Sequence, residues 1–340
     1  MGEFELLARV KERLPQAGPP VRLGSGDDAA ISVPGGATAT SVDALIDGVH
    51  FRREWSSLPQ IGAKALAVAL SDLAAMGAEP GEAYVVLGVP PDLDEDGCIE
   101  LLDGMTALAA ETGTTLAGGD VTRAPALTLA LTVVGHAADA EDFVTRSGAQ
   151  PGDALVVTGE LGGAAAGLLL LEGTGVKGGS SGARSSFVPH SDIKDERKRS
   201  LIAQQLEPRP RLGAGRALAA AGATAMIDLS DGLGGDARHL AAASGVGLRI
   251  DAAALPLAAG VAEVAAAAGR NPIELATSGG EDYELLAALP PDLLAAATAA
   301  LQRDAEAALT RIGEVVAGEG VEIRLPGGET LEPTGFDQLG

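Results

Sequence analysis

The sequence has one cysteine, Cys98, among 340 residues, and aromatic residues make up only 2% of it. A single cysteine excludes an intramolecular disulfide and any zinc site built from several cysteines. With so few aromatic side chains, the core must be built from alanine, valine and leucine. These residues bury less apolar area each, so the core depends on close packing.

Basic residues are also scarce, with 24 Lys and Arg against 47 Asp and Glu and a formal net charge of −23. A surface of this charge repels DNA, RNA and anionic membranes, because nucleic-acid binding depends on basic contacts to phosphate. We therefore expect no nucleic-acid partner. Solubility explains most of the acidic residues, and only the clustered aspartates require a further explanation.

No long apolar run occurs, and the longest candidate, residues 164–171, is too short to span a bilayer. Residues 1–5 lack the basic stretch and apolar segment that mark a signal peptide. These features predict a cytoplasmic protein that has no membrane partner.

A chain of 340 residues is longer than a single hydrophobic core usually supports. Turn-forming residues concentrate at 147–153, which marks a domain boundary. We therefore expect two domains, residues 1–148 and 149–340, with a mobile surface loop at about 173–200, where Gly, Ser and charged residues show no apolar period. The patterns predict helices at 61–76, 99–112, 212–221 and 234–243, and strands at 38–42, 83–89, 114–117, 127–134, 154–157, 247–250 and 284–289, with a further strand that runs into Asp228. This alternation favours an α/β or α+β fold.

One acidic run, Asp92 to Gly97 with Asp103 closing it, fits the template of a calcium-binding loop. The preceding Val89-Pro90-Pro91 cannot form the entering helix of an EF-hand, however, and Asp reaches less far than the usual closing Glu. The alternative is a helix N-terminus, with a capping Asp and acidic residues facing the helix dipole. We interpret the run as a helix cap.

The glycine-rich turn at residues 157–163 is typical of a tight turn between a strand and a helix. It lacks the G-x-G-x-x-G spacing of a dinucleotide site, and Glu160 would face a pyrophosphate unfavourably. No P-loop or G-x-S-x-G sequence occurs, and the four histidines are widely dispersed.

Aspartates, several of them flanked by glycine, recur after apolar segments, which predicts that their carboxylates lie at the ends of strands or helices. They occur in Gly24-Ser25-Gly26-Asp27-Asp28, Ser41-Val42-Asp43, Ser71-Asp72, Gly118-Gly119-Asp120 and Asp228-Leu229-Ser230-Asp231-Gly232. Glycine lets backbone amides approach an anion, and aspartate supplies the hard oxygen ligands that Mg²⁺ prefers. Carboxylates that converged in space would repel one another unless cations neutralised them. The clusters together indicate an enzyme that binds Mg²⁺ and a nucleotide.

Six motifs, in this order, resemble the thiamine-monophosphate kinase family over nearly the whole chain: residues 23–30, 69–78, 118–123, 145–149, 227–232 and 278–284. The resemblance implies the two-domain α/β (α+β) fold of the aminoimidazole-ribonucleotide synthetase superfamily. In that fold the N-terminal domain dimerises and the active site lies in the cleft between the domains. The implied reaction transfers a phosphate from ATP to thiamine monophosphate and gives ADP and thiamine diphosphate.

The resemblance also implies the site residues. Several Mg²⁺ ions would be bound by Asp28, Ser41, the Val42 carbonyl, Asp43, Asp72, Asp120, Asp228 and Asp231. ATP would contact Gly119, Asp120, Arg146 and Ser230, and thiamine monophosphate would contact His50, Glu281 and Phe336. Among these, Asp72, Asp120 and Arg146 would act in catalysis. A homodimer is expected on the same basis.

The sequence departs from the family pattern at three places. Relatives often carry threonine at Val42 and tyrosine or tryptophan at Phe336, and the segment 173–200 is longer than usual. Other members of the superfamily stay open as alternatives, although a selenophosphate synthetase or hydrogenase-maturation protein would carry a reactive cysteine in an N-terminal loop or at the C-terminus. A non-catalytic sensor of Mg-nucleotide is the alternative from a different class.

Overall fold

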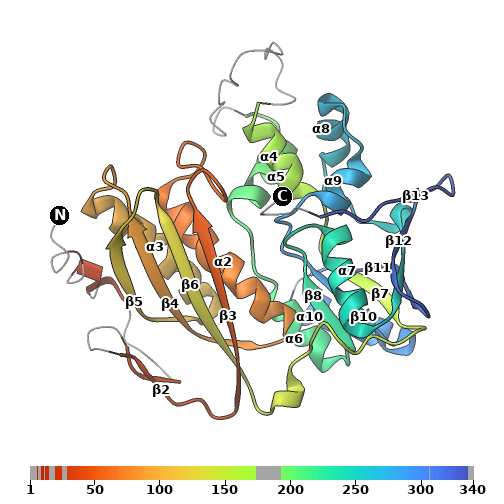
Figure 1. Ribbon diagram of the computed structural model, residues 1–340, viewed down its shortest axis with the longest axis horizontal. Helices are drawn as coiled ribbons and strands as arrows, with labels where there is room; N and C mark the ends of the chain where they lie inside the picture. The colour runs from red at the N-terminus through yellow and green to blue at the C-terminus, as the bar shows by residue number, and fades with distance from the viewer. Residues whose placement is uncertain are drawn as a thin grey trace. The chain divides into compact units, whose positions relative to one another are not determined.

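The computed structural model describes residues 29–173, 193–305 and 307–335, together with residues 6, 9–10, 12–14 and 20–24. The chain folds into two compact units (Figure 1). Unit 1 comprises residues 1–73 and 78–143, and unit 2 comprises residues 74–77 and 144–340. The change of unit at 143–144 lies a few residues before the boundary expected at 148–149.

Unit 1 is built on a four-stranded sheet with the order β3-β6-β4-β5, in which only β4 and β5 are parallel. Leu129, Leu131 and Val133 alternate with more exposed residues along β6 and are fully buried, so one face of the sheet forms the core. The elements are β1 (Val21–Leu23), β2 (Ile31–Ser32), β3 (Ala37–Ile46), α2 (Leu58–Ala75), β4 (Glu79–Val89), α3 (Glu95–Thr112), β5 (Thr115–Arg123), β6 (Thr128–Ala137) and η1 (Ala140–Asp142).

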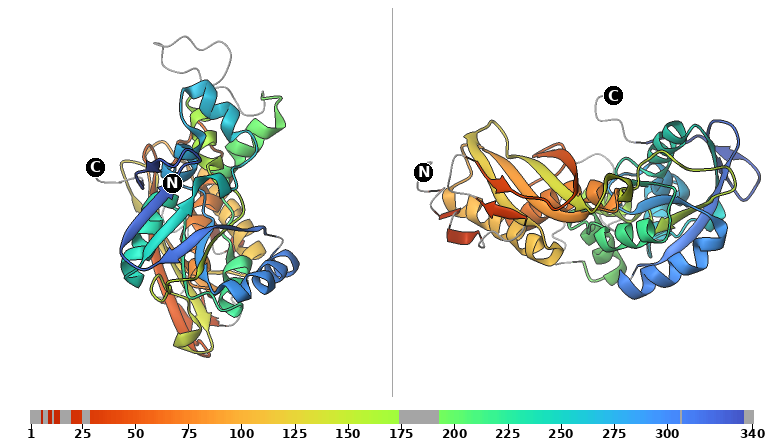
Figure 2. Two further views of the ribbon diagram at one scale, coloured as in Figure 1. Left: turned by 90° about the vertical axis from the view of Figure 1, so that its right-hand side faces the viewer. Right: turned by 90° about the horizontal axis from the view of Figure 1, so that it is seen from below.

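Helices α2 and α3 lie together on one face of this sheet (Figures 1 and 2). They approach closely because glycine stands at their contact. A Cβ atom on Gly62 would lie 1.9 Å from the carbonyl oxygen of Leu101, and one on Gly104 would lie 1.9 Å from that of Pro59. A side chain at either position would push the two helices apart. Close packing of this kind serves a core with few aromatic residues.

Helix α3 begins where the calcium-loop template falls. Asp94 is its N-cap and accepts a hydrogen bond from the backbone N–H of Gly97 at 2.9 Å, while Gly113 ends the helix in the left-handed conformation. Strand β4, not a helix, precedes the acidic run. The interpretation as a helix cap is confirmed.

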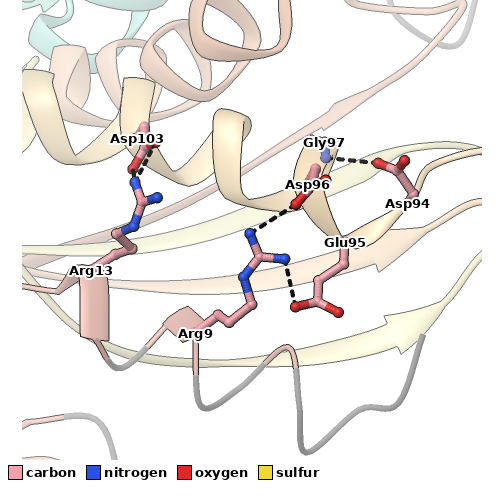
Figure 3. A network of polar contacts seen from close by, with 7 residues as sticks. All are labelled: Arg9, Arg13, Asp94, Glu95, Asp96, Gly97 and Asp103. Carbon is pink, nitrogen blue, oxygen red and sulfur yellow. Dashed lines mark hydrogen bonds and ion pairs between the residues drawn. The ribbon is translucent and has the colours of Figure 1, made fainter.

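Two N-terminal arginines bind the acidic residues of α3 (Figure 3). Arg9 contacts Glu95 at 2.6 Å and Asp96 at 2.9 Å, and Arg13 contacts Asp103 at 2.7 Å. Water screens these pairs at the surface, so they contribute little to stability. Three acidic side chains of α3, Glu95, Asp96 and Asp103, are therefore paired with arginine.

The single cysteine, Cys98, lies in α3 and is buried. Burial raises the pKa of its thiol to about 11, and the nearby carboxylates of Asp94 and Glu95 act in the same direction. The thiol is therefore protonated at neutral pH and is a poor nucleophile.

Unit 2 contains a seven-stranded sheet with the order β13-β12-β9-β11-β7-β10-β8, in which β9 and β12 are parallel and the other neighbours antiparallel. Helix α7 packs on one face, and α6 and α10 lie on the other (Figures 1 and 2). The strands are β7 (Ala154–Thr158), β8 (Ala225–Asp228), β9 (Gly247–Asp251), β10 (Leu285–Leu289), β11 (Leu309–Val316), β12 (Gly320–Arg324) and β13 (Thr330–Leu331).

The helices of unit 2 include a second group, α4, α5, α8 and α9, whose members pack on one another. The helical segments are α4 (Gly163–Leu171), α5 (Glu196–Leu206), α6 (Leu212–Ala220), α7 (Leu233–Ser244), η3 (Ala252–Ala254), α8 (Val261–Ala268), α9 (Pro272–Ser278), η4 (Pro291–Leu293) and α10 (Leu294–Asp304). None of the helices in the described residues is both long and apolar enough to cross a membrane.

The loop expected at 173–200 is shorter than predicted at its C-terminal end. Helix α5 begins at Glu196, where Asp195 caps it through the backbone N–H of Arg197. Charged residues fill the first turn of this helix, so the apolar period that marks a helix begins only in its second half. The sequence pattern therefore did not predict the start of α5. Residues 174–192 of the expected loop lie outside the described residues.

Candidate active site

The first group of expected site residues comes from β3 and α2 in unit 1. The Ser41 hydroxyl donates a hydrogen bond to the Asp72 carboxylate. Ser41 and Asp43 are two residues apart on β3, so they leave the same face of the strand, toward α2. The structure thus brings Ser41, Asp43 and Asp72 together, as their proposed joint role as metal ligands requires.

The electrostatics of this group favour a cation. Burial raises the pKa of Asp43, and the neighbouring Asp72 carboxylate raises it further. The N–H of Ala44, 2.7 Å from the Asp43 carboxylate, and His50 act in the opposite direction. No Lys or Arg pairs with Asp43 or Asp72 in the part of the chain that the structure describes. A bound cation would relieve this unfavourable charge.

His50 lies just after β3, and its Nδ1 accepts a hydrogen bond from the backbone N–H of Ile46 at 3.1 Å. This bond holds the ring beside the end of the strand. His50 is close enough to Asp43 to lower the pKa of that carboxyl. The residue expected to contact the acceptor therefore lies beside the acidic pair.

Gly119 and Asp120 lie at the opposite edge of the same sheet. Asp43 pairs with Leu131, Leu131 with Val85, and Val85 with Gly119, so β3 and β5 are three strand spacings apart, or about 14 Å. Asp120 lies in the next row, and its side chain leaves the opposite face from Asp43. The structure does not bring Asp120 to the acidic pair.

The expectation that aspartates follow strand ends was wrong for Asp43 and Asp120, which lie inside β3 and β5. Both strands continue because their backbones pair over the full length of the sheet. The expectation was right for Asp228, the last residue of β8. Val42 is 69% exposed on the face opposite Ser41.

Within the described residues, no three acidic, histidine or cysteine side chains come close enough to hold a metal ion.

In unit 2, two loops that carry expected site residues are joined by backbone hydrogen bonds. The N–H of Glu281 donates to the carbonyl of Ser230 at 2.8 Å, and the N–H of Tyr283 donates to that of Leu229 at 2.9 Å. Glycine permits this approach, since a Cβ atom on Gly280 would lie 2.5 Å from the Ser230 carbonyl oxygen. Asp228, Ser230, Asp231 and Glu281 are thereby brought to one place.

Asp236, in the first turn of α7, was missed by the sequence analysis. It is buried, and its carboxylate accepts hydrogen bonds from the backbone N–H groups of Asp231 and Gly232, each at 3.1 Å. Burial raises its pKa to about 8, and the charges of Asp228 and Asp231 add to the effect. An acidic residue in the first turn of a helix was the signal that could have found it.

The motif at 278–284 holds three acidic residues with different partners. The Glu281 carboxylate accepts a hydrogen bond from the Gln205 amide of α5. Asp282 accepts from the N–H groups of Gly162 and Ala164, and desolvation nevertheless raises its pKa to about 7.

The third acid of this motif, Glu284, is buried in an ion pair with Arg211, and it also accepts a hydrogen bond from the hydroxyl of Thr158 at 2.6 Å. Only Glu281 was anticipated from the sequence. Asp282, Glu284, Arg211 and Gln205 were missed because their partners lie far away along the chain.

Arg146 has an exposed side chain in unit 2, near the start of that unit. Its backbone is fixed because its carbonyl accepts a hydrogen bond from the Ser244 hydroxyl at 2.9 Å. Two other expected site residues, Asp28 and Phe336, lie outside the described residues.

Both halves of the chain match family models. The model for the N-terminal domain of AIR synthase related proteins matches residues 26–137, and that for the C-terminal domain matches residues 150–326. The thiamine-monophosphate kinase of Mycobacterium tuberculosis is 38% identical over 291 residues, covering 84% of this chain and 80% of that protein. This chain belongs to the thiamine-monophosphate kinase family.

Solved structures agree with this assignment. The crystal structure of thiamine-monophosphate kinase from Stenotrophomonas maltophilia is 35% identical, with a TM-score of 0.79 and 96% coverage of both chains. A structure described as AaThiL complexed with AMPPCP and TMP is 30% identical, with a TM-score of 0.75, and covers 98% of this chain and 96% of that one. The family resemblance and the two-domain mixed α/β fold expected from the sequence are confirmed.

Proposed function

We propose that the protein catalyses transfer of the γ-phosphoryl group of ATP to thiamine monophosphate, giving ADP and thiamine diphosphate. The observation that supports this most strongly is the similarity to thiamine-monophosphate kinases over most of both chains. The relative described with AMPPCP and TMP holds an ATP analogue together with a second ligand whose name matches the acceptor. Ser41, Asp43 and Asp72 lie together and add the hydroxyl and carboxylate oxygens that could bind the Mg²⁺ such a reaction needs.

The reaction needs no general base, because the acceptor phosphate has a second pKa of about 6 and is largely ionised at neutral pH. The obstacle is repulsion between an anionic acceptor and an anionic triphosphate. Mg²⁺, when bound, offsets this repulsion by neutralising charge on both groups. The Asp43 and Asp72 carboxylates fit Mg²⁺, since they are hard oxygen donors whose mutual repulsion a divalent cation relieves.

The remaining roles follow the family pattern. Ser41, the Val42 carbonyl, Asp28, Asp228 and Asp231 are proposed as further Mg²⁺ ligands. Asp120 is proposed as a ligand of a different ion from the one at Asp43 and Asp72, because its side chain leaves the opposite face of the sheet. Gly119, Asp120, Arg146 and Ser230 are proposed to bind ATP, with the Arg146 guanidinium stabilising charge on the polyphosphate. His50, Glu281 and Phe336 are proposed to bind thiamine monophosphate.

We also propose a cytoplasmic homodimer that assembles through unit 1. Val42 and Val86 project from the face of the four-stranded sheet opposite α2 and α3, and they are 69% and 45% exposed. A second copy of this sheet would cover the apolar strip. Light scattering coupled to size-exclusion chromatography tests this proposal, and a monomer mass at micromolar concentration would overturn it.

The test of function is ³¹P NMR of the purified protein with ATP, Mg²⁺ and thiamine monophosphate. We expect the resonances of thiamine diphosphate and ADP to appear, and to be lost when EDTA removes Mg²⁺. Intact ATP would favour a non-catalytic sensor of Mg-nucleotide. Consumption of ATP without thiamine diphosphate would instead point to another acceptor within the superfamily.

A further inference from the structure

Two neighbouring residues of unit 2 adopt a backbone conformation that side chains disfavour. Glu281 has φ of 67° and Tyr283 has φ of 49°, and they are the non-glycine residues with positive φ in the described part of the chain. Such conformations persist only where the surroundings hold them, and they concentrate at functional sites. The segment 281–283 must therefore be held in place by its surroundings.

One side of the segment is held by the loop at 229–230. The N–H groups of Glu281 and Tyr283 donate to carbonyls of that loop at 2.8 and 2.9 Å. The residue between them, Asp282, faces the other way, toward α4. The backbone of Glu281 and Tyr283 thus contacts the 229–230 loop, and the side chain of Asp282 between them contacts α4.

Asp282 holds the other side by capping a helix that is remote in sequence. The N-cap of α4 is Gly162, which has no side chain to satisfy the first N–H groups of the helix. The Asp282 carboxylate accepts from the N–H of Gly162 at 2.7 Å and from that of Ala164 at 3.2 Å. A carboxylate also interacts favourably with the positive end of the helix dipole.

Helix α4 in turn fixes the element that contacts the Glu281 side chain. A Cβ atom on Gly167 of α4 would lie 2.2 Å from the carbonyl oxygen of Leu201 in α5, so the two helices are in close contact. Gln205 of α5, which is 6% exposed, donates from its side-chain amide to the Glu281 carboxylate. The α4–α5 pair therefore sets both the backbone of Glu281, through Asp282, and its carboxylate, through Gln205.

We propose that Asp282 is a positioning residue that fixes Glu281 for binding of the acceptor, by tying the strained segment 281–283 to the N-terminus of α4. The inference rests on the proposed function, because it takes Glu281 as a contact of thiamine monophosphate. Asp282 itself contacts backbone amides and acts on the substrate only through its neighbour.

The test is steady-state kinetics of Asp282→Asn with each substrate varied in turn. The amide keeps the size of the side chain but replaces one acceptor oxygen with a donor that faces a backbone N–H. We expect KM for thiamine monophosphate to rise by about tenfold, with KM for ATP within about twofold of the wild-type value. Asp94→Asn, the same change at the N-cap of α3, is the matched control and should leave both KM values unchanged.

A double-mutant cycle separates positioning from general destabilisation. If Asp282 acts through Glu281, the effect of Asp282→Asn on KM for thiamine monophosphate disappears in a Glu281→Ala background. An equal rise in both KM values, or an effect that persists in that background, would overturn the inference. If Asp282→Asn does not fold, Asp282→Ser takes its place in the same measurements, because serine keeps a hydroxyl acceptor but shortens the link to the α4 amides. KM values equal to those of the wild type would then overturn the inference.

The experiments distinguish a failure of the proposed function from a failure of this inference. Wild-type protein that makes no thiamine diphosphate would refute the kinase activity and the acceptor role of Glu281 together. A wild-type enzyme that turns over, combined with an Asp282→Asn variant whose KM values match it, would refute only the positioning role.

Discussion

Asp43 and Asp72 in unit 1 lie beside a hydroxyl group and each other, whereas Asp282 and Glu284 in unit 2 are surrounded by hydrogen-bond donors. The backbone amides at the start of α4 offset part of the desolvation of Asp282, and the Arg211 guanidinium compensates the charge of Glu284. These two carboxylates of unit 2 thus have donor partners within the fold. Asp43 and Asp72 have no Lys or Arg partner among the described residues, so we expect these two carboxylates to need a bound cation, in line with their proposed role as Mg²⁺ ligands.

The comparison is tested most directly by Asp72→Asn. The variant removes a charged ligand but keeps an oxygen that can accept from Ser41, so we expect the fold to persist while turnover falls roughly 10²- to 10³-fold. Turnover is measured by ³¹P NMR and stability by urea unfolding. Near-wild-type rates, or an unfolded variant, would contradict the assignment of this residue as a metal ligand.

The pH dependence of stability isolates Asp282. Its folded pKa of about 7 lies above the ordinary value of 3.8, so the folded state binds an extra proton between these values. Its contribution to stability is therefore complete below about pH 4 and is lost as the pH rises toward 8, by at most about 4 kcal/mol.

Urea unfolding of wild type and Asp282→Asn across pH 4–8, in EDTA, measures this contribution. We expect the free energy of unfolding of the wild type, minus that of the variant, to fall as the pH rises. A difference that stays constant would show that the carboxyl is not protonated in the folded state at neutral pH.

Arg211→Ala should destabilise the protein because it leaves the buried Glu284 carboxylate without its cation. Glu284 is 4% exposed but Arg211 is 36% exposed, so we expect a cost of at most about 3 kcal/mol, the value for losing one partner of a buried pair. Arg249→Ala is the matched control, since Arg249 is equally exposed but its partners Glu314 and Glu322 are far more exposed than Glu284, and its loss should cost much less. Equal unfolding free energies for the two variants would contradict the distinction between buried and exposed pairs.

Asp94→Ala gives the smallest expected effect and shows that unit 1 also has structural carboxylates. Loss of the α3 N-cap should cost about 1 kcal/mol and leave turnover unchanged. Calcium titration by calorimetry should give no heat from the acidic run at residues 92–103. A heat of calcium binding that is seen with the wild type and is absent from Asp94→Ala would revive the calcium-loop interpretation.

Local signals in the sequence predicted much of the fold. The apolar period of α2, the cap of α3 and the strand that ends at Asp228 were all predictable, because each depends on residues within a few positions of one another. That Ser41 and Asp72 would lie near each other was implied only by the family motifs, which make both of them metal ligands, since no local rule places a strand beside a helix 31 residues away.

The missed features depend on distant partners. Asp282 caps α4 from 120 residues away, and Arg211 neutralises Glu284 from 73 residues away. The Asp236 carboxylate accepts hydrogen bonds from the amides of Asp231 and Gly232. This contact could be predicted only if the conformation of the chain at the start of α7 were already known. Asp43 and Asp120 were placed at strand ends because glycine and aspartate usually mark turns, yet pairing across the sheet kept both strands extended.

The buried thiol of Cys98 has a practical consequence for watching this protein at work. At pH 7.5 a thiol with a pKa of about 11 is almost entirely protonated, and its side chain is shielded from reagents. A cysteine introduced at an exposed position can therefore be coupled to a fluorophore by maleimide chemistry without first removing the native one. Pairs of such labels, one in each unit, would report distances between the units during turnover in the wild-type background.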